Sequence, residues 1–158
     1  IACFSAVKDG EVVLEAIGSD EYYVLTELIE NFMKMKSDET PFICTWNGCG
    51  FDIPFIYKRM AIIGMSEPNL TLSYWMKRYV YQPHCDLMQV WANWNSGAYE
   101  KLDNVASAVL GDKKNDFDVT RIAELMDSKT GQQDIIDYCT QDTLLTDKLY
   151  HKLHGYLF

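Results

Sequence analysis

The sequence predicts an α/β layer fold, with a mixed sheet and flanking helices. Short apolar segments of strand length stand at 1–7, 11–17, 42–47 and 83–87. Longer segments with apolar residues at helical spacing lie between them and after them. The 158 residues, of which 48% are hydrophobic, are enough for one domain with a proper core.

The connections between these segments support the same arrangement. Asp9-Gly10 separates the first two strands and is a strong hairpin signal. Gly64 and Gly111 stand at expected helix ends, and Gly131 is expected to mark a break before the last helix. Helices are predicted at 20–36, 52–63, 87–94, 102–110, 119–126 and 133–153.

The composition excludes several classes of protein. Acidic residues outnumber basic ones by 23 to 14, for a net charge of −9, which argues against a broad basic surface that holds duplex nucleic acid. Divalent cations reverse the local charge of an acidic site, so an enzyme that holds a strand end through metal stays possible. The five irregularly spaced cysteines indicate reduced thiols and a cytoplasmic protein. No apolar run is long enough to span a membrane.

The last helix carries an acid on its apolar stripe. Residues spaced i, i+3, i+4 and i+7 from Ile135 onward should face the core, and Asp142 lies among them. Burying a carboxylate is costly unless it is paired, protonated or bound to metal. Tyr138 precedes Asp142 by one turn on the same face. A buried ion pair or a tyrosine–aspartate hydrogen bond therefore explains Asp142 as well as a metal does.

A second acid, Asp52, stands between the strand at 42–47 and the helix at 52–63. As a helix cap it would precede Ile53 and Pro54, which make a good helix entry. The end of a strand that leads into a helix is also the usual place for chemistry in α/β sheets. Asp52 and Asp142 together form a plausible pair of ligands for a divalent metal.

Two motifs give the sequence a family resemblance. The stretch NGCGFD at 47–52 resembles the second motif of the 3′–5′ exonucleases with four acidic metal ligands, the DEDD type. The stretch YCTQD at 138–142 resembles their third motif in its tyrosine form. The segments 78–91, 101–111 and 137–150 fit as well. Over nearly its whole length, the chain resembles the predicted exonucleases related to the proofreading domain of family B DNA polymerases.

The resemblance implies a ribonuclease H-like fold and catalysis with two Mg²⁺ or Mn²⁺ ions. By the same resemblance, Asp52 and Asp142 are metal ligands, and Tyr138 orients the attacking water. Asn47 and Phe51 are expected to line the 3′-terminal nucleotide.

The family also carries an Asp-x-Glu pair on its first strand, and this sequence has no such pair in the corresponding place. We expect that strand upstream of Ile1, so that 1–158 is a single exonuclease-like domain truncated at its N-terminus. The strands at 1–4 and 42–44 should then not be hydrogen-bonded neighbours, because the upstream strand lies between them. Asp86 matches an aspartate that is expected to cap the helix after it.

Aromatic and basic side chains provide candidate substrate contacts. Lys77 and Arg78 are the best candidates for phosphate contacts, although a solvated face explains them equally well. A stacked base is worth about 1–3 kcal/mol. The candidate stacking residues are Trp46, Trp75, Tyr79 and Tyr81.

These observations favour a metal-dependent 3′–5′ exonuclease that acts on single-stranded DNA or on DNA 3′ ends. An RNA-directed exonuclease is an alternative, because contacts with the 2′-hydroxyl cannot be read from the sequence. A second alternative is a non-catalytic module that lacks the Asp-x-Glu pair and binds nucleic acid, a polymerase or another replication protein. A structural α/β domain, with Asp52 as a cap and Asp142 as a hydrogen-bonded core acid, is the third.

Overall fold

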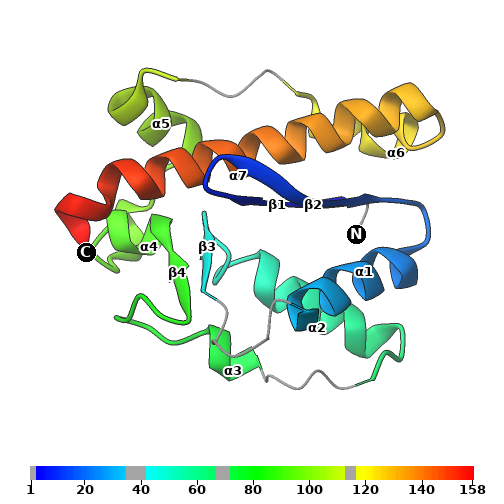
Figure 1. Ribbon diagram of the computed structural model, residues 1–158, viewed down its shortest axis with the longest axis horizontal. Coiled ribbons are helices and arrows are strands. Elements are labelled where there is room, and N and C mark those ends of the chain that lie inside the picture. Colours follow the sequence, from blue (N-terminus) through cyan, green and yellow to red (C-terminus); the bar gives the residue numbers. More distant parts are fainter. Residues whose placement is uncertain (1–2, 35–41, 67–71, 113–116) are drawn as a thin grey trace.

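The computed structural model describes residues 3–34, 42–66, 72–112 and 117–158, which form a mixed α/β arrangement (Figure 1). β1 (Cys3–Lys8) pairs with β2 (Glu11–Ile17) in the antiparallel sense. Asp9 and Gly10 both have positive φ, at 52° and 81°, so the predicted hairpin is confirmed. β3 (Ile43–Thr45) pairs with β4 (His84–Asp86) in the parallel sense.

The described strands form two separate two-stranded sheets, β1–β2 and β3–β4, where the sequence predicted one mixed sheet. The separation arises because β1 pairs only with β2 among the described residues, and β3 pairs only with β4. Among the described residues, Cys3 and Phe4 of β1 do not pair with β3, as predicted, whereas Ile1 and Ala2 lie outside the described residues.

The helices follow the predicted pattern with several differences in their bounds. α4 ends at Trp91, earlier than expected, because Asn93 and Trp94 adopt positive φ values of 51° and 56°. The helices are α1 (Glu21–Lys34), α2 (Asp52–Ile62), α3 (Leu72–Trp75), α4 (Leu87–Trp91), α5 (Leu102–Leu110), α6 (Ile122–Leu125) and α7 (Lys129–Leu157), with 3₁₀ turns η1 (Ser96–Ala98) and η2 (Val119–Arg121).

The start of α7 corrects the expected break at Gly131, which lies inside the first turn of the helix. Ser128 caps this helix, and its side chain accepts a hydrogen bond from the Gly131 amide at 3.0 Å. A Cβ at Gly131 would stand 2.2 Å from the Leu125 carbonyl oxygen. The glycine therefore allows close packing of α7 against the end of α6.

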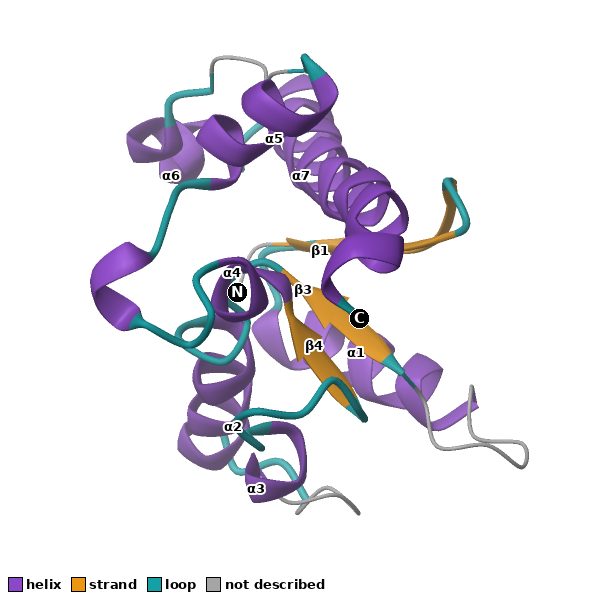
Figure 2. Cartoon of the chain, turned by 90° about the vertical axis from the view of Figure 1, so that its left-hand side faces the viewer, coloured by secondary structure: helices purple, strands orange, loops and turns teal. Residues whose placement is uncertain are grey.

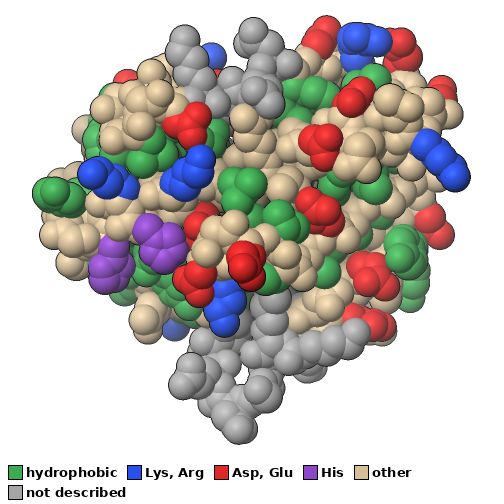
Figure 3. Space-filling model, turned by 45° about the horizontal axis from the view of Figure 1, so that its top comes forward, with side chains coloured by type: hydrophobic (Ala, Val, Ile, Leu, Met, Phe, Trp, Pro, Cys, Tyr) green, Lys and Arg blue, Asp and Glu red, His purple; other side chains and the backbone are tan. Residues whose placement is uncertain are grey.

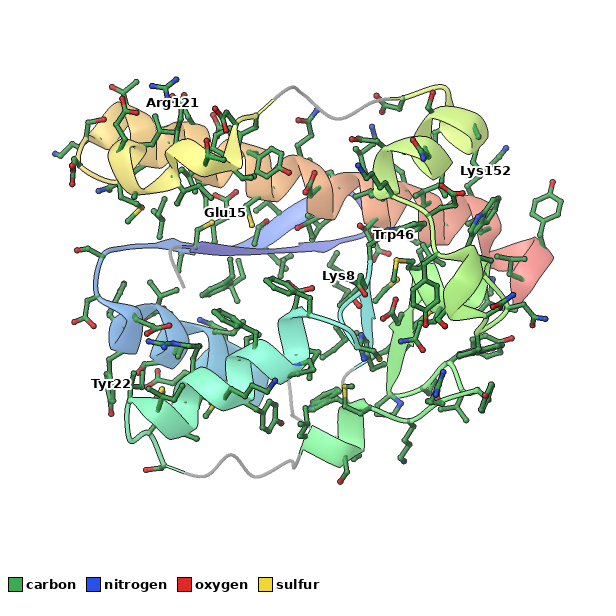
Figure 4. The ribbon with its side chains drawn as sticks, turned by 180° about the vertical axis from the view of Figure 1, so that it is seen from behind. Lys8, Glu15, Tyr22, Trp46, Arg121 and Lys152 are labelled. Atoms are coloured by element: carbon green, nitrogen blue, oxygen red, sulfur yellow. The ribbon has the colours of Figure 1, made fainter. Side chains whose placement is uncertain are left out.

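The elements stack in layers around the β1–β2 hairpin. α7 runs along one side of the hairpin, and α1 and α2 lie on the other (Figures 1 and 2). α5 and α6 pack on the outer side of α7. The Thr140 hydroxyl on α7 bonds to Ser5 Oγ at 3.0 Å and donates to the Glu15 carboxylate. Figure 4 shows Glu15 on the side of the hairpin that faces α7.

Two apolar clusters hold these layers together. The larger joins β4, α4 and α5 to α7, and its most buried members include Cys85, Leu87 and Leu149. The smaller contains Leu25, Leu28 and Met60 from α1 and α2, with Phe4 packed against it. The second cluster therefore places α2, which begins at Asp52, against α1 and the hairpin.

An ion pair between α1 and α2 supports the same placement. Arg59 Nε donates to Glu21 Oε1 at 2.8 Å, and Arg59 Nη2 contacts the second carboxylate oxygen. The Arg59 guanidinium lowers the pKa of Glu21.

Candidate active site

The turn after β3 has a conformation that only a few residue types accept. Asn47 has φ +66°, in the left-handed region that asparagine tolerates better than most residues. A Cβ at Gly48 would lie 2.2 Å from Thr45 Oγ1, and one at Gly50 would lie 2.3 Å from Asn47 Oδ1. The sequence NGCG is therefore required by the tight packing of this turn on itself.

Asp52 is the first residue of α2 and does not act as its side-chain cap. Phe51 occupies the N-cap position, and no side chain there makes a capping hydrogen bond. The structure thus does not support the interpretation of Asp52 as a helix cap. Its side chain reaches solvent, yet desolvation by the surrounding protein raises the pKa of its carboxyl, and the negative charge of Asp86 adds to this rise.

Asp86 caps α4 as predicted, and it also reaches the Asn47 turn. Its Oδ1 accepts the Gln89 amide at 3.4 Å and the Asn47 amide at 3.0 Å, and its Oδ2 accepts the Cys49 amide at 2.9 Å. Asp86 is only 5% exposed, so these donors satisfy a buried carboxylate. Capping was visible in the sequence, whereas the contacts with residues far along the chain were not.

The middle of α7 contributes the second acid. Asp142 is half-buried, and its Oδ1 atom is buried without a hydrogen bond from the described residues, although Asp142 makes other interactions. One turn earlier, Cys139 hydrogen-bonds Cys3 of β1, which is the main reason that the pKa of the Cys139 thiol is raised. Burial and the negative charges of Asp142 and Asp52 raise it further. The charges of Asp52 and Asp142 thus both contribute to the raised pKa of the Cys139 thiol.

Tyr138 stands on the same helix beside an open pocket of about 410 Å³. Its ring stacks on Phe117, with ring centroids 4.5 Å apart and planes inclined by 14°. The sequence prediction did not include Phe117. The pocket is lined by Phe117, Asp118, Arg121, Leu125, Asp134, Asp137, Tyr138 and Gln141.

An exposed aromatic pair stands beside Asp52. Phe51 is 59% exposed and Phe55 is 39% exposed, and their rings stack 5.6 Å apart with an interplanar angle of 6°. The sequence prediction included Phe51 but missed Phe55. The i, i+4 spacing of Phe51, at the N-cap of α2, and Phe55, on α2, is the signal that identifies the pair.

Two basic residues, Lys77 and Arg78, follow α3 in the chain. Arg78 is exposed, and its positive charge opposes the rise in the pKa of the Cys49 thiol, which burial and Asp86 bring to about 12. The Arg78 guanidinium also lies 5.6 Å from the centre of the Tyr79 ring. Lys77 is exposed, and its ammonium lies 5.3 Å from the centre of the Tyr74 ring.

Two tryptophans are less available for stacking than expected. The Trp75 side chain is 7% exposed, and its indole donates to the Tyr57 hydroxyl at 2.9 Å. Trp46 is half-buried against the larger apolar cluster and donates to the Glu100 carbonyl oxygen at 3.3 Å (Figure 4). The buried position of Trp75 rules it out as an open stacking surface, whereas Tyr79 and Tyr81 are 66% and 37% exposed.

The described residues contain no group of three or more His, Cys, Asp or Glu side chains arranged to hold a metal ion. The donor set still has the right chemistry, because carboxylate oxygens are the ligands that Mg²⁺ and Mn²⁺ prefer. Asp52 and Asp142 therefore fit part of such a site, and their metal-binding role stays a prediction.

The surface agrees with the acidic composition. On the face drawn in Figure 3, Asp and Glu side chains are spread among apolar and polar ones, and Lys and Arg side chains form no broad patch. None of the described helices combines the length and the apolar character needed to cross a membrane.

Comparisons with known proteins agree with this geometry. Residues 1–156 match the family described as predicted 3′–5′ exonuclease related to the exonuclease domain of PolB. DNA polymerase 1 of Saccharolobus solfataricus is 30% identical over 154 residues, a match that covers 90% of this chain and 17% of the polymerase. The DNA polymerase catalytic subunit of Elephantid herpesvirus 1 is 27% identical over 147 residues, covering 80% of this chain and 14% of the subunit. The chain thus spans less than a fifth of either polymerase. It belongs to the family of predicted 3′–5′ exonucleases related to the exonuclease domain of PolB.

Proposed function

We propose that this chain is the nuclease part of a metal-dependent 3′–5′ exonuclease that shortens DNA from its 3′ end. The observation that carries the proposal is the match of residues 1–156 to the family of predicted 3′–5′ exonucleases, with Asp52 and Asp142 in the motifs NGCGFD and YCTQD. The negative charges of Asp52 on α2 and Asp142 on α7 both raise the pKa of the Cys139 thiol, which supports a position for the two acids in one region.

Asp52 and Asp142 would hold two Mg²⁺ or Mn²⁺ ions, together with an Asp-x-Glu pair of the kind that the family resemblance implies on the first strand of a ribonuclease H-like sheet. When bound, such ions supply an activated water and relieve the charge on the leaving oxygen.

The other residues have roles in positioning. The Tyr138 hydroxyl would orient the attacking water, since a tyrosine hydroxyl can both donate and accept a hydrogen bond. The exposed Phe51–Phe55 stack would pack against the terminal base, and Asn47 would contact the same nucleotide.

Several side chains would hold the strand that leads to the terminal nucleotide. Arg78 would contact a backbone phosphate, because its charge already reaches Cys49 in the Asn47 turn. Lys77 would contact a neighbouring phosphate. Trp46, Tyr79 and Tyr81 remain the proposed stacking residues, with Trp46 the least accessible of the three.

DNA is the proposed substrate because both relatives are named as DNA polymerases. A polymerase or another replication protein is the proposed partner for the same reason. All five cysteines are free, which supports a reducing compartment such as the cytoplasm.

A non-catalytic module that binds nucleic acid is the second candidate function. The observation that favours it is the absence, among the described residues, of three metal-ligating side chains in one group. If no Asp-x-Glu pair completes the site, Asp52 and Asp142 alone provide too few ligands for two ions.

The test incubates the full-length protein with 5′-labelled single-stranded DNA or RNA of matched sequence, with Mg²⁺ or with a chelator. The expected result is a ladder of DNA products shortened from the 3′ end that needs Mg²⁺. Equal shortening of RNA and DNA would mean that the substrate is single-stranded nucleic acid in general and not DNA alone. Binding to DNA without any metal-dependent shortening would reject the nuclease and favour the non-catalytic module.

A further inference from the structure

Three consecutive amides in the turn after β3 are held by side chains from the ends of β3 and β4. The Asn47 and Cys49 amides donate to the two oxygens of Asp86, at 3.0 Å and 2.9 Å. Between them, the Gly48 amide donates to Thr45 Oγ1 at 3.1 Å. We call these three contacts the amide clamp.

The Thr45 end of the clamp is fixed by a buried histidine. His84 is 3% exposed, and its Nδ1 lies 3.0 Å from the Trp75 carbonyl oxygen, which can only accept a hydrogen bond. Nδ1 therefore carries the proton, and Nε2 accepts from the Thr45 hydroxyl at 2.8 Å. The Thr45 oxygen is left to accept the Gly48 amide.

The parallel pairing of β3 with β4 explains why these side chains meet at one turn. Thr45 and Asp86 are register partners at the ends of the two strands. Parallel strands end at the same edge of a sheet. The side chain of Asp86, the last residue of β4, therefore reaches the turn that follows β3.

The clamp holds a conformation that the turn would not keep by itself. Asn47 is held at positive φ, which is costly for a residue with a side chain. The Asn47 carbonyl oxygen accepts the Gly50 and Phe51 amides, both at 3.0 Å, and the Gly48 carbonyl oxygen accepts the Ile53 amide at 2.9 Å. The start of α2, and with it Asp52, is thus connected directly to the clamped residues.

We propose that Asp86 is a positioning residue that holds Asn47 and the start of α2, and thereby sets where the Asp52 carboxylate stands. This inference rests on the proposed function of Asp52. It goes beyond the capping of α4, because a cap needs only the contact with Gln89, and that contact is the longest backbone contact of Asp86, at 3.4 Å.

The main test compares Asp86→Asn with two matched variants in the full-length protein. An asparagine side chain has one acceptor oxygen, so it can keep only one of the two clamped amides. Asp20→Asn makes the same change at the cap of α1, where Asp20 Oδ1 accepts the Tyr22 and Tyr23 amides. Gln89→Met removes the 3.3 Å side-chain contact with Asp86 and leaves the clamp in place.

The first readout is amide hydrogen exchange at Asn47 and Cys49 without added metal, which does not depend on activity. In Asp86→Asn, at least one of these amides should exchange about tenfold faster or more, because a buried donor loses its partner. Asp20→Asn and Gln89→Met should leave exchange at both positions unchanged. Unchanged exchange in Asp86→Asn would overturn the clamp.

The second readout is nuclease rate as a function of Mg²⁺ concentration. For Asp86→Asn we expect about a 10–100-fold loss in apparent Mg²⁺ affinity or in rate, the usual effect of removing a group that orients a metal ligand. Asp20→Asn should match the wild type. If wild-type protein has no nuclease activity, the proposed function fails while the exchange data still test the clamp. If Asp86→Asn cuts DNA with wild-type Mg²⁺ dependence, the positioning role is wrong while the nuclease stands.

A milder variant covers the case in which Asp86→Asn does not fold. Thr45→Val keeps the shape of the side chain but removes both the hydrogen bond to His84 and the acceptor of the Gly48 amide. Of the three clamped amides, only that of Gly48 loses its partner, so exchange should rise at Gly48 and not at Asn47 or Cys49. The nuclease rate of Thr45→Val should fall by less than tenfold. Unchanged Gly48 exchange in this variant would contradict the clamp by a separate route.

Discussion

Asp52 and Asp142, whose charges both raise the pKa of the Cys139 thiol, are held by two different kinds of structure. Asp142 lies inside a helix of 29 residues, whose next turns bury Leu145 and Leu149 in the larger apolar cluster. Asp52 follows a short turn that polar side chains hold through the amide clamp.

The two structures, α7 around Asp142 and the turn before Asp52, should respond differently to mutation. The position of the helix depends on many apolar contacts, so its failure should appear mainly as lost stability. The turn depends on a few directional hydrogen bonds, so its failure should appear mainly as lost function.

The largest effect should come from removing either carboxylate. A catalytic metal contributes several kcal/mol to the transition state, so Asp52→Asn and Asp142→Asn should each lower the Mg²⁺-dependent rate by about a thousandfold or more. Rates on single-stranded DNA measure this, with Asp103→Asn on the exposed face of α5 as a control for the same chemical change. If either variant keeps the full rate, that residue is not a metal ligand.

The next largest effect is expected from a mutation in α7, the helix that carries Asp142. Leu149 is 0% exposed, so Leu149→Ala should lower the free energy of unfolding by about 2–5 kcal/mol. The fraction that stays folded should keep most of its activity, since the clamp is untouched. Tyr156 on the same helix is 80% exposed, and Tyr156→Ala should change stability by only about 0.5 kcal/mol. Urea unfolding compares the two, and equal losses would show that burial does not hold α7.

A smaller effect is expected at Tyr138. Tyr138→Phe keeps the ring that stacks on Phe117 and removes only the hydroxyl. The loss of one hydrogen bond to a water corresponds to about a tenfold lower rate or less. Single-turnover rates with Mg²⁺ test this, with Tyr156→Phe as the control. An unchanged rate would show that the Tyr138 hydroxyl does not position the water and that the side chain serves only for packing.

The smallest effect concerns pH and the histidine behind the clamp. Burial lowers the pKa of His84 from its ordinary value of 6.5, while the Trp75 carbonyl and the charge of Asp86 oppose this. Below that ordinary value the unfolded chain gains a proton that the folded state does not, so stability should fall as pH decreases until the folded-state pKa is reached. The loss should be on the order of 1 kcal/mol.

Urea unfolding between about pH 5 and pH 7.5, on either side of the ordinary histidine pKa, measures this loss. His84→Gln should reduce the pH dependence, and His154→Gln, at an exposed position, should leave it unchanged. An identical pH dependence in all three proteins would contradict the assignment to His84.

The sequence predicted those features whose signals are local. The hairpin follows from Asp9-Gly10, and the cap of α4 follows from an aspartate placed before a helix. The family resemblance, which rests on short motifs, is confirmed over residues 1–156.

Features that depend on distant contacts could not be predicted in the same way. The contacts between Asp86 and the Asn47 turn join residues 37 and 39 positions apart, so no local pattern marks them. Trp75 was expected to stack bases because it lies among aromatic and basic residues, yet its burial depends on its packing against α2. The division into two sheets likewise depends on which strands pair, and hydrophobic patterns do not determine pairing.

The order of the elements along the chain has a consequence for synthesis on the ribosome. The hairpin closes over two residues and can form within about 1–10 μs of its emergence. β3 cannot pair until β4 has been synthesised. Cys139, whose thiol pKa is raised by the charges of both acids, belongs to α7, near the end of the chain. At roughly 5–20 residues per second, about 5–18 s separate the synthesis of Asp52 from that of Asp142. A nascent chain therefore carries its hairpin and first helices well before Asp142 is synthesised.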